Sequence, residues 1–218
     1  MALSRLNYNS LNVTPAASKG IGFDAGADDL AATFSGGDIT FIKKLTASAS
    51  ATLSFVDGTS DVVLDNTYKE YLFTFKSIHG ATDDMALTVG FRDGGSAYDA
   101  TKTTTSFRPY QAEGSTASAL GYGASEDLAQ STGFQMLGND AGNDSDQATS
   151  GYMHLFDPSS TTFVKHFIAR TNVSSASDLS MNTFTAGYCN VTAAIDGVQF
   201  AMRTGNMDSG DICLYGIN

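Results

Sequence analysis

Basic residues are scarce in this chain. Lys and Arg number 12 against 23 Asp and Glu, so the formal net charge is −11 and the isoelectric point is near 4.4. A field of that sign repels phosphate backbones and anionic lipid, so we expect neither nucleic acid nor a lipid surface as a partner. Charged residues of both signs make up only 16% of the sequence. Such a polar, weakly charged surface is typical of extracellular and virion β proteins.

Long apolar runs and cysteines are also few. No stretch reaches the roughly 18 apolar residues that a membrane helix needs, so we expect no membrane insertion. The opening "MALSRLNYNSLNV" has no apolar signal region, which predicts a soluble protein made in a cytoplasm. Cys189 and Cys213 are expected as buried reduced thiols, and a disulfide requires their strands to be neighbours in an oxidising compartment.

Helical periodicity is nearly absent. The segment Ser125–Phe134, "SEDLAQSTGF", begins with a capping-type serine followed by two acids, which predicts one or two helical turns. The chain has no heptad array, collagen triplet or tandem repeat. A long fibre shaft is therefore not expected.

Two-residue alternation of apolar and polar side chains is abundant from Ile39 onward. In "KEYLFTFKSI", Tyr71, Phe73 and Phe75 fall on one side and the residues between them on the other. Similar runs are "ITFIKKL", "ATLSFVDG", "MALTVGFRDGG", "TTSFRPY", "SGYMHLF", "TTFVKHFIAR", "NTFTAGYCNV", "AIDGVQFAM" and "DICLYGI". Gly, Asn, Asp and Ser clusters separate them, as in hairpins. The pattern predicts an all-β protein, an antiparallel β-sandwich of jelly-roll or Greek-key type over residues 38–218.

The C-terminal run "ICLYGIN" is apolar on both faces. Ile212 and Leu214 share one face, while Cys213, Tyr215 and Ile217 take the other. A strand of this kind is best interpreted as central, paired on both sides, so that hydrogen bonds hold the terminus.

Residues 1–37 differ from the rest, with short apolar runs broken by Gly, Pro and Asp. They are interpreted either as an extended arm that docks on another protein or as a peripheral strand pair of the same domain, with a boundary at "SGGD" (35–38). In the first interpretation, burial of apolar side chains supplies the docking energy. These side chains are Leu3, Leu6, Tyr8, Leu11, Val13, Ile21 and Phe23.

The sequence contains only weak matches to metal-binding, nucleotide-binding and catalytic motifs. His154 and His166 lie within strand-like runs without a third metal ligand, and His79 precedes a turn. "GIGFDAG" resembles a dinucleotide fingerprint, but no buried strand precedes it and no good helix follows. No nucleophile elbow, P-loop or CxxC pair is present. We expect no enzyme activity, no catalytic residue, no metal and no cofactor.

Two loops are the candidates for ligand contact. "GNDAGNDSDQ" is interpreted as a solvated surface loop or as a calcium- or sugar-contacting loop, with Asp140, Asp144 and Asp146 as its ligands. The second loop, Gly94–Tyr98, offers Tyr98 for contact with a receptor. Most aromatic residues lie in strand runs and are expected in the core, whereas Tyr98, Tyr110 and Tyr122 lie nearer to loops and are expected to stack on sugars or line a subunit interface.

Several segments resemble one group of proteins. "LFDPSSTTF", "AIDGVQF" and the terminal "LYGI" are similar to structural proteins of marine tailed bacteriophages, and the resemblance runs from about Ile39 to the end, with further likeness in the N-terminal segment. The resemblance implies a virion component of fibre, appendage or decoration type with no assigned chemistry.

The hypothesis from the sequence is a bacteriophage virion protein displayed on the particle as capsid decoration or a short head fibre. Its expected partners are other copies of itself, as a trimer, and other phage capsid or tail proteins. The alternatives are a tail-fibre receptor-binding protein that contacts a host surface glycan, and a free lectin-like carbohydrate-binding module.

Overall fold

The computed structural model describes the backbone of residues 20–23, 30–34 and 39–218, and the side chains from residue 39 onward. In this part the chain forms strands and no helix. The strands are β1 (Gly20–Phe23), β2 (Leu30–Phe34), β3 (Ile39–Thr46), β4 (Leu53–Val56), β5 (Glu70–Gly80), β6 (Met85–Arg92), β7 (Lys102–Ala112), β8 (Ser118–Tyr122), β9 (Gln135–Ala141), β10 (Thr149–Phe156), β11 (Lys165–Ser174), β12 (Leu179–Cys189), β13 (Gly197–Met202) and β14 (Met207–Ile217).

The chain divides into two compact units, residues 1–40 and 41–218. In the first unit, β1 and β2 form a two-stranded antiparallel sheet of their own. Most of the proposed docking residues and the expected boundary at 35–38 lie outside the described residues. The docking residues outside are Leu3, Leu6, Tyr8, Leu11 and Val13, while Ile21 and Phe23 belong to β1 without described side chains. The docking arm therefore stays a prediction.

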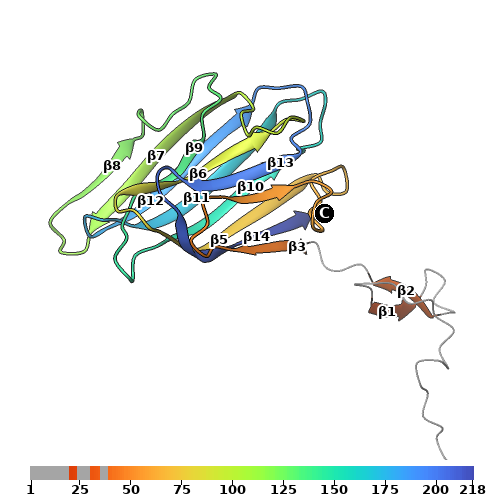
Figure 1. Ribbon diagram of the computed structural model, residues 1–218, viewed down its shortest axis with the longest axis horizontal. Coiled ribbons are helices and arrows are strands. Elements are labelled where there is room, and N and C mark those ends of the chain that lie inside the picture. The colour runs from red at the N-terminus through yellow and green to blue at the C-terminus, as the bar shows by residue number, and fades with distance from the viewer. Residues whose placement is uncertain (1–19, 24–29, 35–38) are drawn as a thin grey trace, which may run out of the picture. The chain divides into compact units, whose positions relative to one another are not determined.

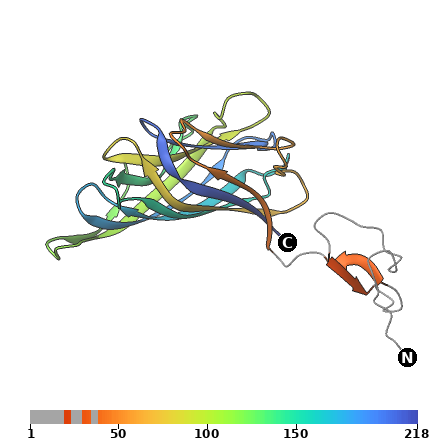
Figure 2. The same cartoon turned by 60° about the horizontal axis from the view of Figure 1, so that its bottom comes forward.

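The second unit consists of two antiparallel sheets, which confirms the all-β, sandwich-like class. The eight-stranded sheet has the order β3-β14-β5-β10-β11-β12-β7-β8, and the four-stranded sheet has the order β4-β13-β6-β9 (Figure 1). From β3 to β7 the chain changes sheet at every step, whereas β10, β11 and β12 follow one another within the larger sheet. The two layers can be followed edge-on in Figure 2.

The inner faces of the two sheets enclose the core. Phe200 on β13 lies at its centre, with ring centroids 5.2 Å from Phe75, 5.4 Å from Phe73 and 6.2 Å from Phe55. All four rings are buried. The edge-to-face geometry of these contacts suits the quadrupoles of the rings. Because Phe73 and Phe75 belong to the larger sheet and Phe200 to the smaller one, this cluster joins the two layers.

The prediction for the C-terminal strand is confirmed. β14 lies between β3 and β5, with Ile212 and Leu214 buried and Tyr215 partly exposed on the other face. Its pairing with β5 shifts register near Gly210. Gly210 has φ of +113°, and a Cβ there would lie 2.5 Å from the carbonyl oxygen of Ser77. Glycine is needed at this bulge because an L side chain fits neither that dihedral angle nor that space.

The two cysteines cannot form a disulfide within one chain. Cys189 lies on β12 and Cys213 on β14, and three strands separate them in the sheet. Four strand spacings amount to about 19 Å, far beyond the reach of a disulfide. Cys189 is buried in the core, and Cys213 faces outward and is partly exposed.

This difference predicts a selective thiol labelling pattern. Burial raises the pKa of Cys189 to about 12, so its thiol stays protonated as well as covered, and only the thiolate is nucleophilic. A maleimide should therefore label one thiol in the native protein and two in denaturant, as counted by mass spectrometry. In the control Cys213→Ser, the native protein should take up no label. Native labelling of Cys189 would contradict the placement of this side chain.

The helical turns predicted for Ser125–Phe134 are wrong. This segment runs along the part of β7 that β8 does not cover, where the amide of Thr104 donates to Leu128 O at 2.9 Å. Lys102 and Ser131 exchange two backbone hydrogen bonds of 2.9 and 3.0 Å. The backbone groups that a helix would pair internally are thus used to complete the edge of the sheet. Long-range pairing overrides the local capping signal.

Candidate functional site: the outer face of the eight-stranded sheet

The outer face of the larger sheet carries most of the exposed hydrophobic side chains. In residues 39–218, eight large hydrophobic side chains are exposed, and five of them lie on the outer face of β7, β8, β10 and β11. The five are Phe107, Leu120, Tyr122, Tyr152 and Ile168. On β7, β10 and β11 strand alternation explains the arrangement, since the residues on either side of these side chains point into the sandwich. An exposed group of this kind marks a binding surface.

Five outward side chains form a row across the strands. In register, Tyr152 on β10 lies opposite Arg170 on β11, Arg170 opposite Phe184 on β12, Phe184 opposite Phe107 on β7, and Phe107 opposite Tyr122 on β8. The Arg170 guanidinium lies 4.9 Å from the ring centroid of Phe184, which stacks on Phe107 at 4.8 Å with an interplanar angle of 3°. Four strand spacings give the row a length of about 19 Å. We call it the aromatic row.

A second row of outward side chains runs across the same strands, beside the aromatic row. It consists of Ile168, Ala186 and Thr105, which lie opposite one another on β11, β12 and β7. Beyond it, His166 and Tyr188 are paired across β11 and β12, with ring centroids 5.8 Å apart. Because Ala186 and Thr105 are small, they form the floor between two taller walls. Two shallow hollows of about 280 and 250 Å³ meet at these two residues, and we call them together the transverse groove.

The charge of this face differs from that of the whole chain. Along β7, β8, β10, β11 and β12 the outward positions hold Arg170 and two histidines, and no Asp or Glu. Carboxylates flank the face at its two ends. Glu70 pairs with Nδ1 of His154, and Asp127 accepts a hydrogen bond from the Tyr122 hydroxyl. In a chain of net charge −11, the carboxylates that contact this face therefore lie at its ends, and its middle, around Arg170, is lined by uncharged side chains.

The two loops expected to contact a ligand lie at opposite ends of the sandwich. Tyr98 follows β6, and its ring lies beside Gly197, which pairs with Arg92 at the C-terminal end of β6. The loop with Asp144 and Asp146 follows Ala141, which pairs with Met85 at the other end of β6. Eight strand residues place these ends about 23 Å apart. The loops therefore do not form one site.

The three aspartates of "GNDAGNDSDQ" do not lie together in one loop. Asp140 belongs to β9, where burial raises the pKa of its carboxyl group, and its Oδ2 lies 3.8 Å from Nη2 of Arg108. Asp144 and Asp146 are exposed in the loop, whose backbone is held by Gln147 through a 3.1 Å hydrogen bond from the Asp144 amide. Among the residues that the structure describes, no group of three His, Cys, Asp or Glu side chains is placed to hold a metal ion.

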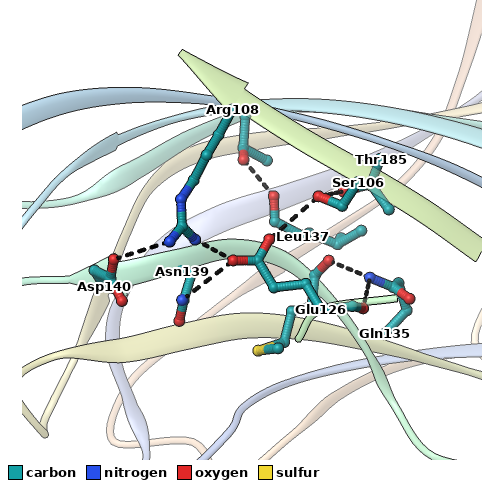
Figure 3. A network of polar contacts seen from close by, with 10 residues as sticks. Ser106, Arg108, Glu126, Gln135, Leu137, Asn139, Asp140 and Thr185 are labelled. Atoms are coloured by element: carbon teal, nitrogen blue, oxygen red, sulfur yellow. Dashed lines mark hydrogen bonds and ion pairs between the residues drawn. The ribbon is translucent and has the colours of Figure 1, made fainter. Parts of the chain in front are cut away.

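A buried polar network supports the groove from inside the sandwich (Figure 3). Glu126 is the centre, with a side chain only 1% exposed. Its carboxylate accepts hydrogen bonds from Arg108, from Ser106 Oγ at 3.2 Å and from Asn139 Nδ2 at 3.3 Å. Arg108 lies between Glu126 and Asp140 (Figure 3). Since Ser106 and Arg108 flank Phe107 on β7, this network fixes the strand that carries Phe107, one member of the aromatic row.

A second buried group closes one end of the sandwich. Lys102 and Lys165 lie on either side of Cys189 in register, and all three side chains are fully buried. The ammonium groups donate to backbone carbonyls of loops, from Lys102 Nζ to Gly133 O at 2.8 Å and from Lys165 Nζ to Val191 O at 2.7 Å. Burial lowers the pKa of both lysines. Because these hydrogen bonds satisfy the ammonium groups, we interpret the lysines as loop anchors.

Comparison with protein-family models, curated proteins and solved structures finds no match to this chain. A search of the described residues for a helix with the length and apolarity of a membrane span also finds none.

Sequence reasoning missed the groove because it assigned strand aromatics to the core. Phe107, Tyr152, Phe184 and Tyr188 all face outward. Of the three tyrosines expected near loops, Tyr122 lies on the outer face, Tyr110 packs against a small inner cluster and Tyr98 is half-buried. The signal was present in "HFIAR", where Phe167 and Ala169 point inward, so His166, Ile168 and Arg170 must point outward.

Proposed function

We propose that this chain is a structural protein of a tailed-bacteriophage virion, displayed on the particle surface as capsid decoration or a short head fibre. One observation carries the proposal, namely the group of exposed aromatic side chains on the outer face of the larger sheet. Such a face is suited to recognition of another molecule. The resemblance of "LFDPSSTTF" and "AIDGVQF" to virion proteins also supports it. In the finer form of the proposal, the sandwich is a jelly roll, the assembly a trimer, and residues 1–37 an arm that docks on the capsid or tail.

Deletion of residues 1–37 tests the proposal. β3 begins at Ile39, so the truncated chain keeps both sheets and is expected to unfold cooperatively in a thermal melt. It should fail to join particles, because the apolar side chains that dock it are gone. The measurement is the copy number per particle by quantitative gel analysis or cryo-electron microscopy. Normal incorporation of the truncated chain would contradict the docking role of residues 1–37. Absence of the full chain from particles would contradict the virion role.

The second candidate is a glycan-binding protein, as a tail-fibre receptor binder or a free lectin-like module. The transverse groove favours it, since an apolar wall beside hydroxyl and guanidinium groups matches the two kinds of surface on a sugar. The copy number per particle also distinguishes a capsid protein from a tail protein, because hundreds of copies indicate the capsid and a few tens or fewer indicate the tail.

A further inference from the structure

We infer that the transverse groove binds an acidic oligosaccharide, with its rings against the aromatic row and a carboxylate or sulfate on Arg170. The inference rests on the glycan-binding form of the proposed function and places the site on the sheet face, away from both loops that the sequence suggested.

The shape of the groove indicates an extended ligand. The aromatic row spans five strands, or about 19 Å, and its members are aligned in register from Tyr152 to Tyr122. Beside it, Ala186 and Thr105 leave a continuous floor between the two hollows. A chain of sugar rings can lie along such a strip with its C–H faces on the aromatic wall. Tyrosine hydroxyls and Thr105 then lie within reach of sugar hydroxyls.

The charge of the groove indicates an anionic group on that ligand. Arg170 lies within the aromatic row, and its Nε donates to Asn182 Oδ1 at 3.1 Å while the ring of Phe184 supports the guanidinium. This contact leaves the other guanidinium N–H groups for a ligand, in the planar arrangement that suits a carboxylate or sulfate. No carboxylate occupies the outward positions of the five strands, and Glu70 and Asp127 contact the residues at the two ends of the face. An anion in the middle of the groove therefore meets Arg170 away from these two carboxylates.

A second copy of the chain is the rival occupant, because Tyr, Phe and Arg also predominate in protein interfaces. We favour the oligosaccharide because each copy in a symmetric dimer would bring Arg170 to the contact, and no carboxylate lies at the outward positions of the five strands to pair with it.

The test measures binding of the full-length protein to pairs of oligosaccharides by calorimetry. Each acidic member, with a uronate, sialate or sulfate group, is matched with its methyl-esterified, asialo or unsulfated counterpart. At least one acidic member should bind roughly tenfold or more tightly than its neutral partner, as expected for charge-assisted hydrogen bonds. Arg170→Met should bring this ratio close to one. Tyr152→Ala should weaken both members of the pair about equally, because it removes ring contact and no charge.

Matched controls separate the groove from general effects. Lys69→Met removes one positive charge outside the groove, at a side chain that is 68% exposed. Phe163→Ala removes a ring outside the groove, in a loop where it is 71% exposed. Neither should change binding, and all four variants should melt like the parent protein because the altered side chains are exposed.

Three results would overturn the inference. The first is no binding across the panel. The second is binding that Arg170→Met and Tyr152→Ala leave intact, which would place the site elsewhere. The third is a stable oligomer that Ile168→Glu dissociates in sedimentation, without any sugar binding, which would make this face a subunit interface. Incorporation into particles is measured separately, so sugar binding by a protein absent from particles would reject the virion role alone.

Discussion

Replacing Phe200 with alanine is expected to lower the free energy of unfolding by about 3–5 kcal/mol. The ring is fully buried and contacts three other phenylalanines, two of them on the opposite sheet. Alanine removes the transfer free energy of the ring and leaves a cavity between two sheets that cannot collapse freely. For a domain of this size the melting temperature should fall by roughly 6–20 °C.

Phe163→Ala is the matched control for Phe200→Ala. The same chemical change is made at a side chain that is 71% exposed, so the free energy of unfolding should change by no more than about 0.5 kcal/mol. Urea denaturation of both variants, followed by circular dichroism, makes the comparison. Equal effects at the two positions would mean that the sheets do not pack as described.

Replacing Glu126 with alanine should cost a similar amount, about 3–5 kcal/mol, for a different reason. The substitution leaves the Arg108 guanidinium in a partly buried site with only the more distant carboxylate of Asp140, at 3.8 Å, and breaking one side of a buried ion pair is strongly destabilising. Ser106 and Asn139 lose an acceptor as well. Glu126→Gln keeps an acceptor oxygen and loses the charge, so it should cost less, about 1–3 kcal/mol.

Glu113→Ala is the control for the loss of a glutamate, because Glu113 is exposed. It should change the free energy of unfolding by no more than about 0.5 kcal/mol. A double-mutant cycle between Glu126→Ala and Arg108→Ala should show coupling, since the two side chains contact each other. A loss below about 1 kcal/mol for Glu126→Ala, or no coupling with Arg108, would show that the network does not hold the segment against β7.

The comparison of sequence with structure is clearest at the aromatic row. From the sequence, Phe107 and Phe184 belong to alternating runs 77 residues apart, and nothing local shows that their strands are neighbours. β12 and β7 pair in the sheet, and this pairing stacks the two rings. The candidate site could not be predicted for this reason, although four of the five residues of the aromatic row lay in runs whose alternation was recognised. Tyr122 did not, because β8 (Ser118–Tyr122) was not predicted as a strand.

Sequence patterns predicted the structure correctly where it depends on a single strand, and incorrectly where it depends on which segments pair with each other. The C-terminal run was apolar on both faces, and β14 is paired on both sides. The capping signal at Ser125 was genuine as a pattern, yet the segment pairs with β7 because an uncovered sheet edge offers more hydrogen bonds than one helical turn. Cys189 and Cys213 both lay in strand-like runs of the sequence, and the structure places Cys189 on the inner face of β12 and Cys213 on the outer face of β14, with three strands between them.

The sequence by itself determined that this protein is all-β, and it determined which residues of most strands share a face. Alternation is a local property with a period of two residues, so it can be read from a single strand. The tertiary structure decided which strands are neighbours, which of the two faces is covered, and therefore where Arg170 and the aromatic side chains meet. Strand pairing joins residues far apart in the chain, and the free energy of that pairing depends on the whole core instead of any one segment.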